Sequence, residues 1–224
     1  MKYLKKKENV MLFAKEKFGL DKVILYLETH FSKVSIFRGK VGDSFPLAAK
    51  KQKADICISY LSPWIIPEEV LRRIKKFAIN FHPGLPTYRG IGCTNFAIYN
   101  EEKTFGATAH LMEPQVDSGR IINVMRFPVL KEDTLWSMTN KCYVFTLFQF
   151  YHVFDYYLLN GKLPLCKDQW SKKLYTRREL NELCKLKTTM RENEIKKRIK
   201  ATKFPNMPGA YFETVRNKAE AGQA

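Results

Sequence analysis

Three residues that can handle protons at a carbonyl group lie within one stretch, residues 79–119. Asn80 and His82 follow an apolar run, and Asp117 lies in the short sequence Val-Asp-Ser-Gly. An imidazole takes and returns a proton near neutral pH, an amide donates to an oxyanion without changing charge, and a carboxylate orients the imidazole. Each residue alone is an ordinary loop or packing residue, so only the three together predict chemistry at a carbonyl carbon.

Strands and helices are expected to alternate along the chain, and this order would bring the three residues together. Apolar, β-branched runs predict strands at 9–14, 34–37, 56–59, 77–81, 107–112 and 121–129. Helices are predicted at 20–31, just before residue 54, from Pro67 to Lys75 or Lys76, and at 95–99, 134–160 and 192–202. The alternation predicts an α/β fold with a mostly parallel sheet flanked by helices, and Asn80 and His82 would lie at the carboxyl edge where ligands bind.

The 224 residues suffice for one α/β domain with a small appended piece. We expect a catalytic domain over residues 1–160 and a short helical or irregular extension over residues 161–224 that packs on it. Within the extension, residues 162–178 are predicted to form a hairpin or irregular structure. The polar residues 217–224 have the composition of a frayed tail or an expression remnant.

The composition restricts the location and the partners. The formal charge of +17 attracts anions, but basic runs are more often solvated helix faces, so nucleic acid is not favoured as a partner. The five cysteines are widely spaced without a CxxC pair, which predicts reduced thiols, a cytoplasmic location and no metal site. No apolar run is long enough for a membrane span, so no membrane partner is expected.

The ordered segments resemble a known family. The succession Asn-x-His-Pro, Leu-Pro-x-Tyr-x-Gly, Gly-Ala-Thr-Ala-His and Asp-x-Gly is similar to that of the formyltransferases that use N10-formyltetrahydrofolate. The likeness covers roughly residues 54–130 and includes the segment 55–67, which matches a strand, loop and helix beside the folate pocket of that family. It implies a Rossmann-like fold and N10-formyltetrahydrofolate as the co-substrate.

The resemblance also implies roles for individual residues. Asn80 would donate to the oxyanion, His82 would act as general acid and base, and Asp117 would orient His82. His110 would support Asp117 without touching the substrate, although a buried structural histidine is an equal alternative. The residues implied for the folate are Tyr60, Leu61, Ile65, Ile66, Pro67, Gln115 and Val116. The residues implied for the acceptor are Tyr88, Arg89 and Gly90.

The run 83–99 most resembles the sugar N-formyltransferases, which formylate amino sugars on nucleotide carriers in glycan or lipopolysaccharide biosynthesis. The expected acceptor is therefore a nucleotide-linked amino sugar, such as a 4-amino-4,6-dideoxyhexose. Methionyl-tRNA and glycinamide ribonucleotide formyltransferases remain alternatives with the same chemistry. The presence of Asn80, His82 and Asp117 speaks against a silent binding module.

The predicted helix 134–160 carries more aromatic residues than one buried face needs. A homodimer interface would absorb the surplus, and such an interface is an expectation of the sequence.

Overall fold

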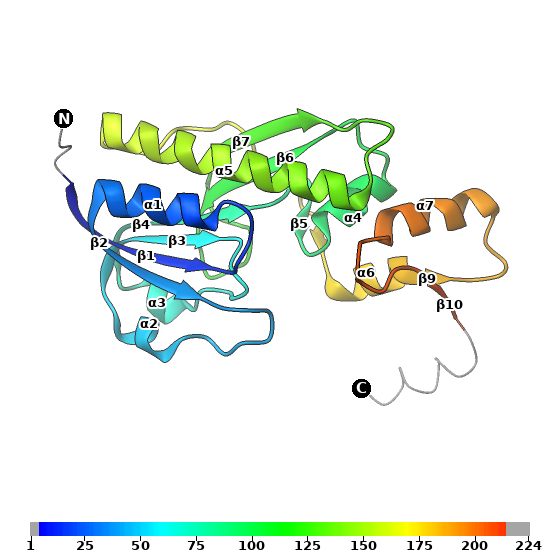
Figure 1. Ribbon diagram of the computed structural model, residues 1–224, viewed down its shortest axis with the longest axis horizontal. Helices are drawn as coiled ribbons and strands as arrows, with labels where there is room; N and C mark the ends of the chain where they lie inside the picture. Colours follow the sequence, from blue (N-terminus) through cyan, green and yellow to red (C-terminus); the bar gives the residue numbers. More distant parts are fainter. Residues whose placement is uncertain (1–4, 214–224) are drawn as a thin grey trace.

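The computed structural model describes residues 5–213 and is built on a twisted six-stranded sheet (Figure 1). In spatial order the strands are β2 (Phe31–Arg38), β1 (Lys6–Ala14), β3 (Ala54–Tyr60), β4 (Ile74–His82), β6 (Thr104–Leu111) and β7 (Ile121–Pro128). The pairs from β2 to β4 are parallel, whereas β6 runs antiparallel to both of its neighbours. The predicted α/β class with a mostly parallel sheet is confirmed, with antiparallel pairing confined to one side.

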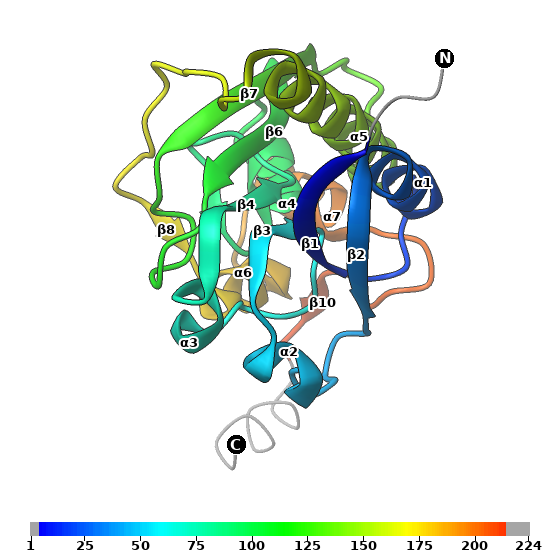
Figure 2. The same cartoon turned by 90° about the vertical axis from the view of Figure 1, so that its left-hand side faces the viewer.

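Helices cover both faces of this sheet (Figure 2). One face packs against α1 (Leu20–His30) and α5 (Leu135–Asn160), and the other against α2 (Leu47–Lys51) and α3 (Glu68–Leu71). Strand β1 shows why, since Val10 and Leu12 point into the first layer while Met11 and Phe13 point into the second. Consecutive apolar residues are the pattern expected of a strand buried on both faces.

Helix α5 begins and ends where the sequence predicts. Thr134 accepts a hydrogen bond from the Ser137 N–H, and the Ser137 hydroxyl accepts one from the Thr134 N–H, which closes a capping box. Most of its aromatic side chains pack inward: Phe150 and Phe154 join the core shared with α1, and Phe145 packs on a second core around Phe127. One helix thus serves two apolar clusters, and this accounts for most of its aromatic surplus.

One sequence prediction is wrong in detail. The helix after Pro67 ends at Leu71, well before Lys75, because Ile74 already pairs with Ala54 of β3 at the start of β4. Of the two structures predicted for residues 162–178, the irregular one is found up to residue 173, and β8 (Leu174–Tyr175) then pairs in parallel with β5 (Arg89–Gly90), far away in the sequence. A pairing between segments so far apart in the sequence cannot be predicted from local sequence patterns.

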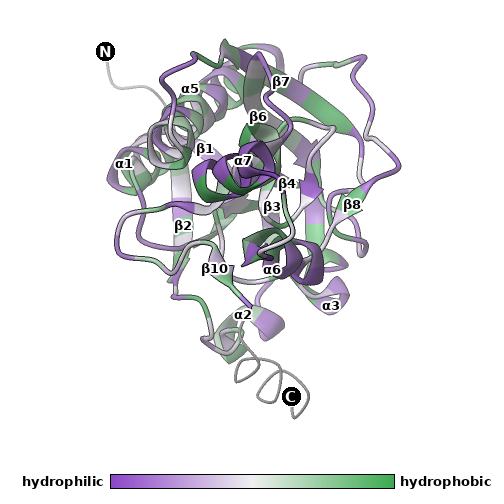
Figure 3. Cartoon of the chain, turned by 90° about the vertical axis from the view of Figure 1, so that its right-hand side faces the viewer, coloured by the Kyte–Doolittle hydropathy of each residue, from purple (hydrophilic) through white to green (hydrophobic). Residues whose placement is uncertain are grey.

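The extension after α5 lies at one end of the molecule, where its helices show hydrophilic stretches (Figure 3). It contains α6 (Arg177–Cys184), which the sequence did not predict, and α7 (Glu192–Thr202), predicted with the same bounds. β9 (Lys185–Leu186) pairs with β10 (Tyr211–Phe212). Helix α7 packs against α4 (Cys93–Tyr99), and the Asn95 amide donates to the Ala201 carbonyl at 2.8 Å.

Two expectations concern the ends of the chain and the membrane. Residues 217–224, expected to be a tail, lie outside the described residues. Within residues 5–213, none of the helices has the length and apolarity that crossing a bilayer requires.

Candidate functional site

Strands β4 and β6 bring Asn80, His82 and His110 onto one face of the sheet. Asn80 and His82 are two residues apart, so their side chains leave β4 on the same side. His110 lies directly opposite Asn80 in the antiparallel register with β6. The Asn80 amide nitrogen is consequently 3.1 Å from Nε2 of His110.

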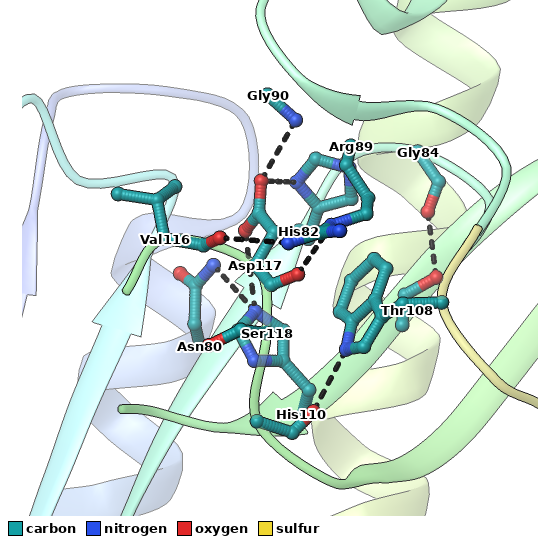
Figure 4. A network of polar contacts seen from close by, with 12 residues as sticks. Asn80, His82, Gly84, Arg89, Gly90, Thr108, His110, Val116, Asp117 and Ser118 are labelled. Atoms are coloured by element: carbon teal, nitrogen blue, oxygen red, sulfur yellow. Dashed lines mark hydrogen bonds and ion pairs between the residues drawn. The ribbon is translucent and has the colours of Figure 1, made fainter. Parts of the chain in front are cut away.

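Asp117 lies between the two histidines (Figure 4). Its Oδ2 is 3.4 Å from Nδ1 of His82, and its Oδ1 is 3.4 Å from Nε2 of His110. The Gly90 N–H donates to Oδ2 at 2.9 Å and fixes the carboxylate from the third side. Asp117 itself has a φ of 47°, a left-handed conformation that aspartate tolerates better than most residues, and this turns its side chain toward the sheet.

The contacts of His82 show which of its ring nitrogens can exchange a proton. Nε2 lies 2.9 Å from the Tyr88 carbonyl oxygen, which can only accept, so this nitrogen keeps its hydrogen. Nδ1, which faces Asp117, is therefore the titrating nitrogen. Burial alone lowers the pKa of His82, but Cys93, the Asp117 carboxylate and the Tyr88 carbonyl outweigh burial and raise it to about 9. The raised pKa favours the imidazolium form of His82 at neutral pH.

The contact with His82 also affects the pKa of Asp117. Burial by itself raises the pKa of the Asp117 carboxyl, yet the charge of His82, the contacts with His110 and the Gly90 N–H hold that pKa well below its usual range. Only 5% of each side chain is exposed, so the ion pair lies in a low-dielectric environment where it is barely screened.

His110 orients the amide of Asn80. Its Nδ1 lies 2.7 Å from the Leu111 carbonyl oxygen and must carry a hydrogen to donate there. Nε2 lies 3.1 Å from the Asn80 amide nitrogen and 3.4 Å from Oδ1 of Asp117, and the contact with Asn80 occupies one amide N–H at most, which leaves the other available. Asn80 is also more exposed than either histidine or Asp117, so the cluster offers a free N–H donor at its accessible edge.

A comparison with known proteins assigns this region to a family. Residues 38–146 match the family model described as formyl transferase. The matched stretch, just under half of the 224 residues, is similar to the formyl transferase domain, and the rest of the chain lies outside the match. The cluster of Asn80, His82, His110 and Asp117 lies entirely within the matched residues, from β4 to the loop that follows β6.

The curated relatives that match this region carry names that describe different activities. The chain is 33% identical over 117 residues, 51% of its length, to the bifunctional polymyxin resistance protein ArnA of Wigglesworthia glossinidia brevipalpis. It is 34% identical over 88 residues, 39% of its length, to the GDP-perosamine N-formyltransferase of Brucella melitensis, and 32% identical over 88 residues to the methionyl-tRNA formyltransferase of Enterococcus faecalis. The matched parts span only 16%, 34% and 28% of these relatives.

Solved structures share the fold over almost the whole chain. A 4-N formyltransferase from Francisella tularensis superposes with a TM-score of 0.77 at 18% identity, covering 93% of both chains. A sugar N-formyltransferase from Shewanella sp gives 0.73 at 19% identity, covering 93% of this chain and 94% of that one. An N-formyltransferase from Helicobacter canadensis, in complex with folinic acid and dTDP-3-aminofucose, gives 0.70 at 21%, covering 86% and 80%. These similarities confirm the fold of the formyl transferase domain and its extension.

The residues expected at the folate lie on two loops of the formyl transferase domain that flank β4. Leu61 follows Tyr60, which pairs with Phe81, and Met112 follows Leu111, which pairs with Ile79. The two loops meet in one apolar cluster that includes Trp64, Ile66 and Met112. The side chains of Ile65, Gln115 and Val116 are exposed, whereas those of Leu61 and Ile66 are buried and that of Pro67 is half-buried.

Tyr60, also expected at the folate, points the other way. Its ring is buried in the core against Phe81 and Phe150, and its hydroxyl is 3.5 Å from the Phe18 carbonyl. An inward position is required because Tyr60 ends β3 on the same face as Ile58 and Ile56. Its side chain therefore packs in the core, and only its backbone faces the loop.

The residues expected at the acceptor have internal partners in the structure. The Tyr88 ring is buried against Phe105 and Tyr175, and its hydroxyl donates to Glu102 at 2.7 Å. Arg89 donates to the carbonyls of Asp117 and Ser171, and the Gly90 N–H binds the Asp117 carboxylate. Tyr88 thus packs in the second core, and Arg89 and Gly90 hold the loop of Asp117 in place.

Sequence reasoning missed two contributors to the site. Cys93, at the start of α4, places its sulfur 3.5 Å from Nε2 of His82, although no CxxC or other motif marked it. Trp170, in the extension, packs on both histidines from a segment that has no periodic pattern. Only the three-dimensional structure brings these residues to the cluster.

Proposed function

We propose that the chain transfers a formyl group from N10-formyltetrahydrofolate to the amine of a nucleotide-linked amino sugar. The observation that supports this most is the cluster of Asn80, His82, His110 and Asp117 inside a formyl transferase domain. Moving a formyl group between two nitrogens needs a donor to the carbonyl oxygen and a group that carries a proton. The cluster provides both within hydrogen-bonded or ion-paired contact.

The loops beside β4 have the chemistry that a folate would need. A pterin is flat, with hydrogen-bonding edges and apolar faces, and pockets for such molecules combine apolar walls with a few polar groups. Ile65 and Val116 are exposed apolar side chains on the two loops. We assign Leu61, Ile65, Ile66, Pro67, Gln115 and Val116 to this pocket, with the backbone of Tyr60. The folate supplies the formyl carbon as an amide of its N10 nitrogen.

The residues of the chain act on the carbonyl oxygen and on one proton. The free Asn80 N–H and the His82 imidazolium stabilise the negative charge that the oxygen acquires as the acceptor amine attacks. His82 then gives its Nδ1 proton to the nitrogen that leaves, and the proton lost by the amine restores the imidazolium. Asp117 remains charged throughout and keeps Nδ1 oriented, while His110 keeps the Asn80 amide oriented.

The acceptor assignment rests on similarity. A relative is named a GDP-perosamine N-formyltransferase, and solved neighbours include sugar N-formyltransferases and a complex with folinic acid and dTDP-3-aminofucose. We keep the 4-amino-4,6-dideoxyhexose predicted from the sequence as the acceptor. Assays with GDP- and dTDP-linked sugars that carry the amine at carbon 3 or carbon 4 distinguish the choices, and we expect the 4-amino sugars to give the larger kcat/KM.

A single substitution tests the chemistry. His82→Asn should lower kcat on the order of a hundredfold to ten-thousandfold, since it removes the proton carrier. Binding of 5-formyltetrahydrofolate, followed by fluorescence, and the circular dichroism spectrum should stay unchanged. His152→Asn, on the exposed side of α5, is the matched control. Full activity in His82→Asn would reject the assignment.

Methionyl-tRNA is the second candidate acceptor. The charge of +17 and the 32% identity to a methionyl-tRNA formyltransferase favour it. Binding of tRNA through phosphate contacts weakens steeply with salt, whereas binding of a small nucleotide sugar weakens much less. Turnover of charged tRNA, with KM rising many-fold between 50 and about 200 mM salt, would select this alternative.

We further propose the division of the chain and its assembly. Residues 1–160 form the catalytic domain, and the extension from 161 onward packs on it through α7 and α4 and through β8 and β5. A homodimer would use the exposed aromatic residues of α5, Trp136 and Phe148. Sedimentation equilibrium at micromolar concentration measures this directly, and a monomer mass rejects the dimer.

A further inference from the structure

Trp170 brings the extension into contact with the catalytic cluster. The centre of its ring system is 4.9 Å from that of His110 and 5.8 Å from that of His82, and the planes are nearly perpendicular, at 86° and 78°. These are edge-to-face geometries of the kind that stabilise aromatic pairs. Trp170 thus contacts both rings that flank Asp117.

The indole is held in this position by polar contacts. Its Nε1–H donates to the Gly119 carbonyl at 2.7 Å, two residues after Asp117. The guanidinium of Arg89 lies over the ring at 5.9 Å, and the same group donates to the Ser171 carbonyl at 3.1 Å. The Ser171 N–H in turn donates to the Pro86 carbonyl at 3.1 Å. Trp170 is therefore fixed to both loops that hold the histidine and aspartate side chains.

Trp170 also borders a surface hollow. A cavity of about 490 Å³ is lined by residues 118–121 and by 166–170, and Trp170 is part of its wall. The same indole packs on His82 and His110, and these two side chains and that of Asp117 are each at most 5% exposed. Trp170 therefore contributes both to the wall of the hollow and to the packing around the ion pair.

We propose that Trp170 is a positioning residue that excludes water from the His82–Asp117 ion pair and fixes the two imidazole rings for formyl transfer. The inference rests on the proposed function of His82. Screening by water weakens a charge pair severalfold relative to a dry site. A one-ångström displacement of a catalytic ring costs on the order of a hundredfold in rate. Trp170 thus makes the extension part of the catalytic machinery.

The effect on His82 can be measured without any turnover. The chain has four histidines, so a nitrogen-15 NMR titration resolves each ring, and His82→Asn identifies the signal of His82. In Trp170→Ala we expect the His82 midpoint to fall by about one pH unit from its parent value, because water weakens the pairing that raises it. Trp170→Phe keeps an aromatic ring against the two imidazoles, so its His82 midpoint should lie close to that of the parent.

Kinetics supply the second readout. We expect kcat in Trp170→Ala to fall on the order of tenfold to a hundredfold with KM for the folate little changed, and to recover largely in Trp170→Phe. Phe212→Ala, at a half-exposed aromatic residue of β10 in the same extension, is the matched control and should change neither quantity. Should Trp170→Ala fail to fold, Trp170→Leu keeps apolar bulk without the aromatic ring and carries the same test.

The outcomes separate this inference from the proposed function. A folded Trp170→Ala or Trp170→Leu protein with the parent's His82 midpoint and the parent's kcat overturns the role of Trp170. If the midpoint shifts but parent and variants alike lack formyl transfer, the positioning of His82 stands and the proposed reaction fails.

Discussion

Nδ1 of His82 lies 3.4 Å from Oδ2 of Asp117, and each side chain is only 5% exposed. The separation is longer than the 2.7–2.9 Å typical of a charge-assisted hydrogen bond, and apo sites often have loose contacts that tighten around the substrate. A buried pair of this kind costs desolvation energy for both partners, so its main contribution is the fixed orientation of one proton-bearing nitrogen.

Replacing the carboxylate tests this orientation. Asp117→Asn removes one of the charges that favour the imidazolium, so the pKa of His82 should fall from about 9 toward its ordinary value of 6.5. We expect kcat to drop on the order of a hundredfold or more, with the pH optimum shifted to lower pH. Asp133→Asn, at an equally buried aspartate paired with Lys141 near the start of α5, is the control and should keep parent kinetics.

The ion pair also gives stability a defined dependence on pH. His82 has a raised pKa, so its contribution is complete below about pH 6.5 and is lost as pH rises through about 9. Asp117 has a lowered pKa, so its contribution is present above about pH 4 and is lost in stronger acid. Between pH 6.5 and 9.5 the free energy of unfolding of the parent should therefore fall relative to that of His82→Asn, on the order of 3 kcal/mol.

Urea denaturation at pH 6.5, 8 and 9.5 measures this difference. Because the groups that do not contact His82 are the same in both proteins, subtracting the two curves isolates His82 together with its neighbours Asp117 and Cys93. Parallel curves would mean that His82 gains no proton affinity from the fold.

The sequence predicts local features well and distant packing poorly. Apolar, β-branched runs located all six main strands, and the threonine at position 134 located the start of α5. The sequence placed Asn80 and His82 at the carboxyl edge of a strand, and the structure brings Asp117 beside them. The local sequence around Tyr88 does not distinguish a tyrosine packed in a core from one that contacts a ligand. Its inward position follows only from packing against Phe105 and Tyr175.

Gly90 connects the extension to Asp117 and tolerates no side chain. Its φ is 88°, and a Cβ atom there would lie 2.3 Å from the Tyr175 carbonyl oxygen. Gly90→Ala must therefore separate β5 from β8 and move the N–H that binds Asp117. We expect a loss of stability of about 3 kcal/mol and a loss of kcat on the order of tenfold or more.

Gly42 offers the matched control for this backbone strain. Its φ is 97°, but no heavy atom lies within 4 Å of an added Cβ. Gly42→Ala should cost only about 1 kcal/mol and leave kcat unchanged. Equal effects of the two substitutions on thermal unfolding and on kcat would show that the contact with β8 does not matter to the site.

Arg89 holds the loop of Asp117 against the extension, and lysine cannot replace it. The Arg89 Nε–H donates to the Asp117 carbonyl at 2.7 Å while another N–H reaches the Ser171 carbonyl at 3.1 Å. A lysine ammonium at the end of a flexible chain reproduces one of these contacts at most. Losing a hydrogen bond from a charged donor costs about 2 kcal/mol, so Arg89→Lys should lower the unfolding free energy by that amount and kcat on the order of tenfold.

Arg72→Lys, in an exposed pair with Glu68, controls for the change of residue type and should alter stability by less than about 0.5 kcal/mol. An acceptor phosphate bound by Arg89 would give a different result, with KM for the nucleotide sugar rising and stability unchanged. The two readouts together decide whether this guanidinium supports the Asp117 loop or binds the substrate.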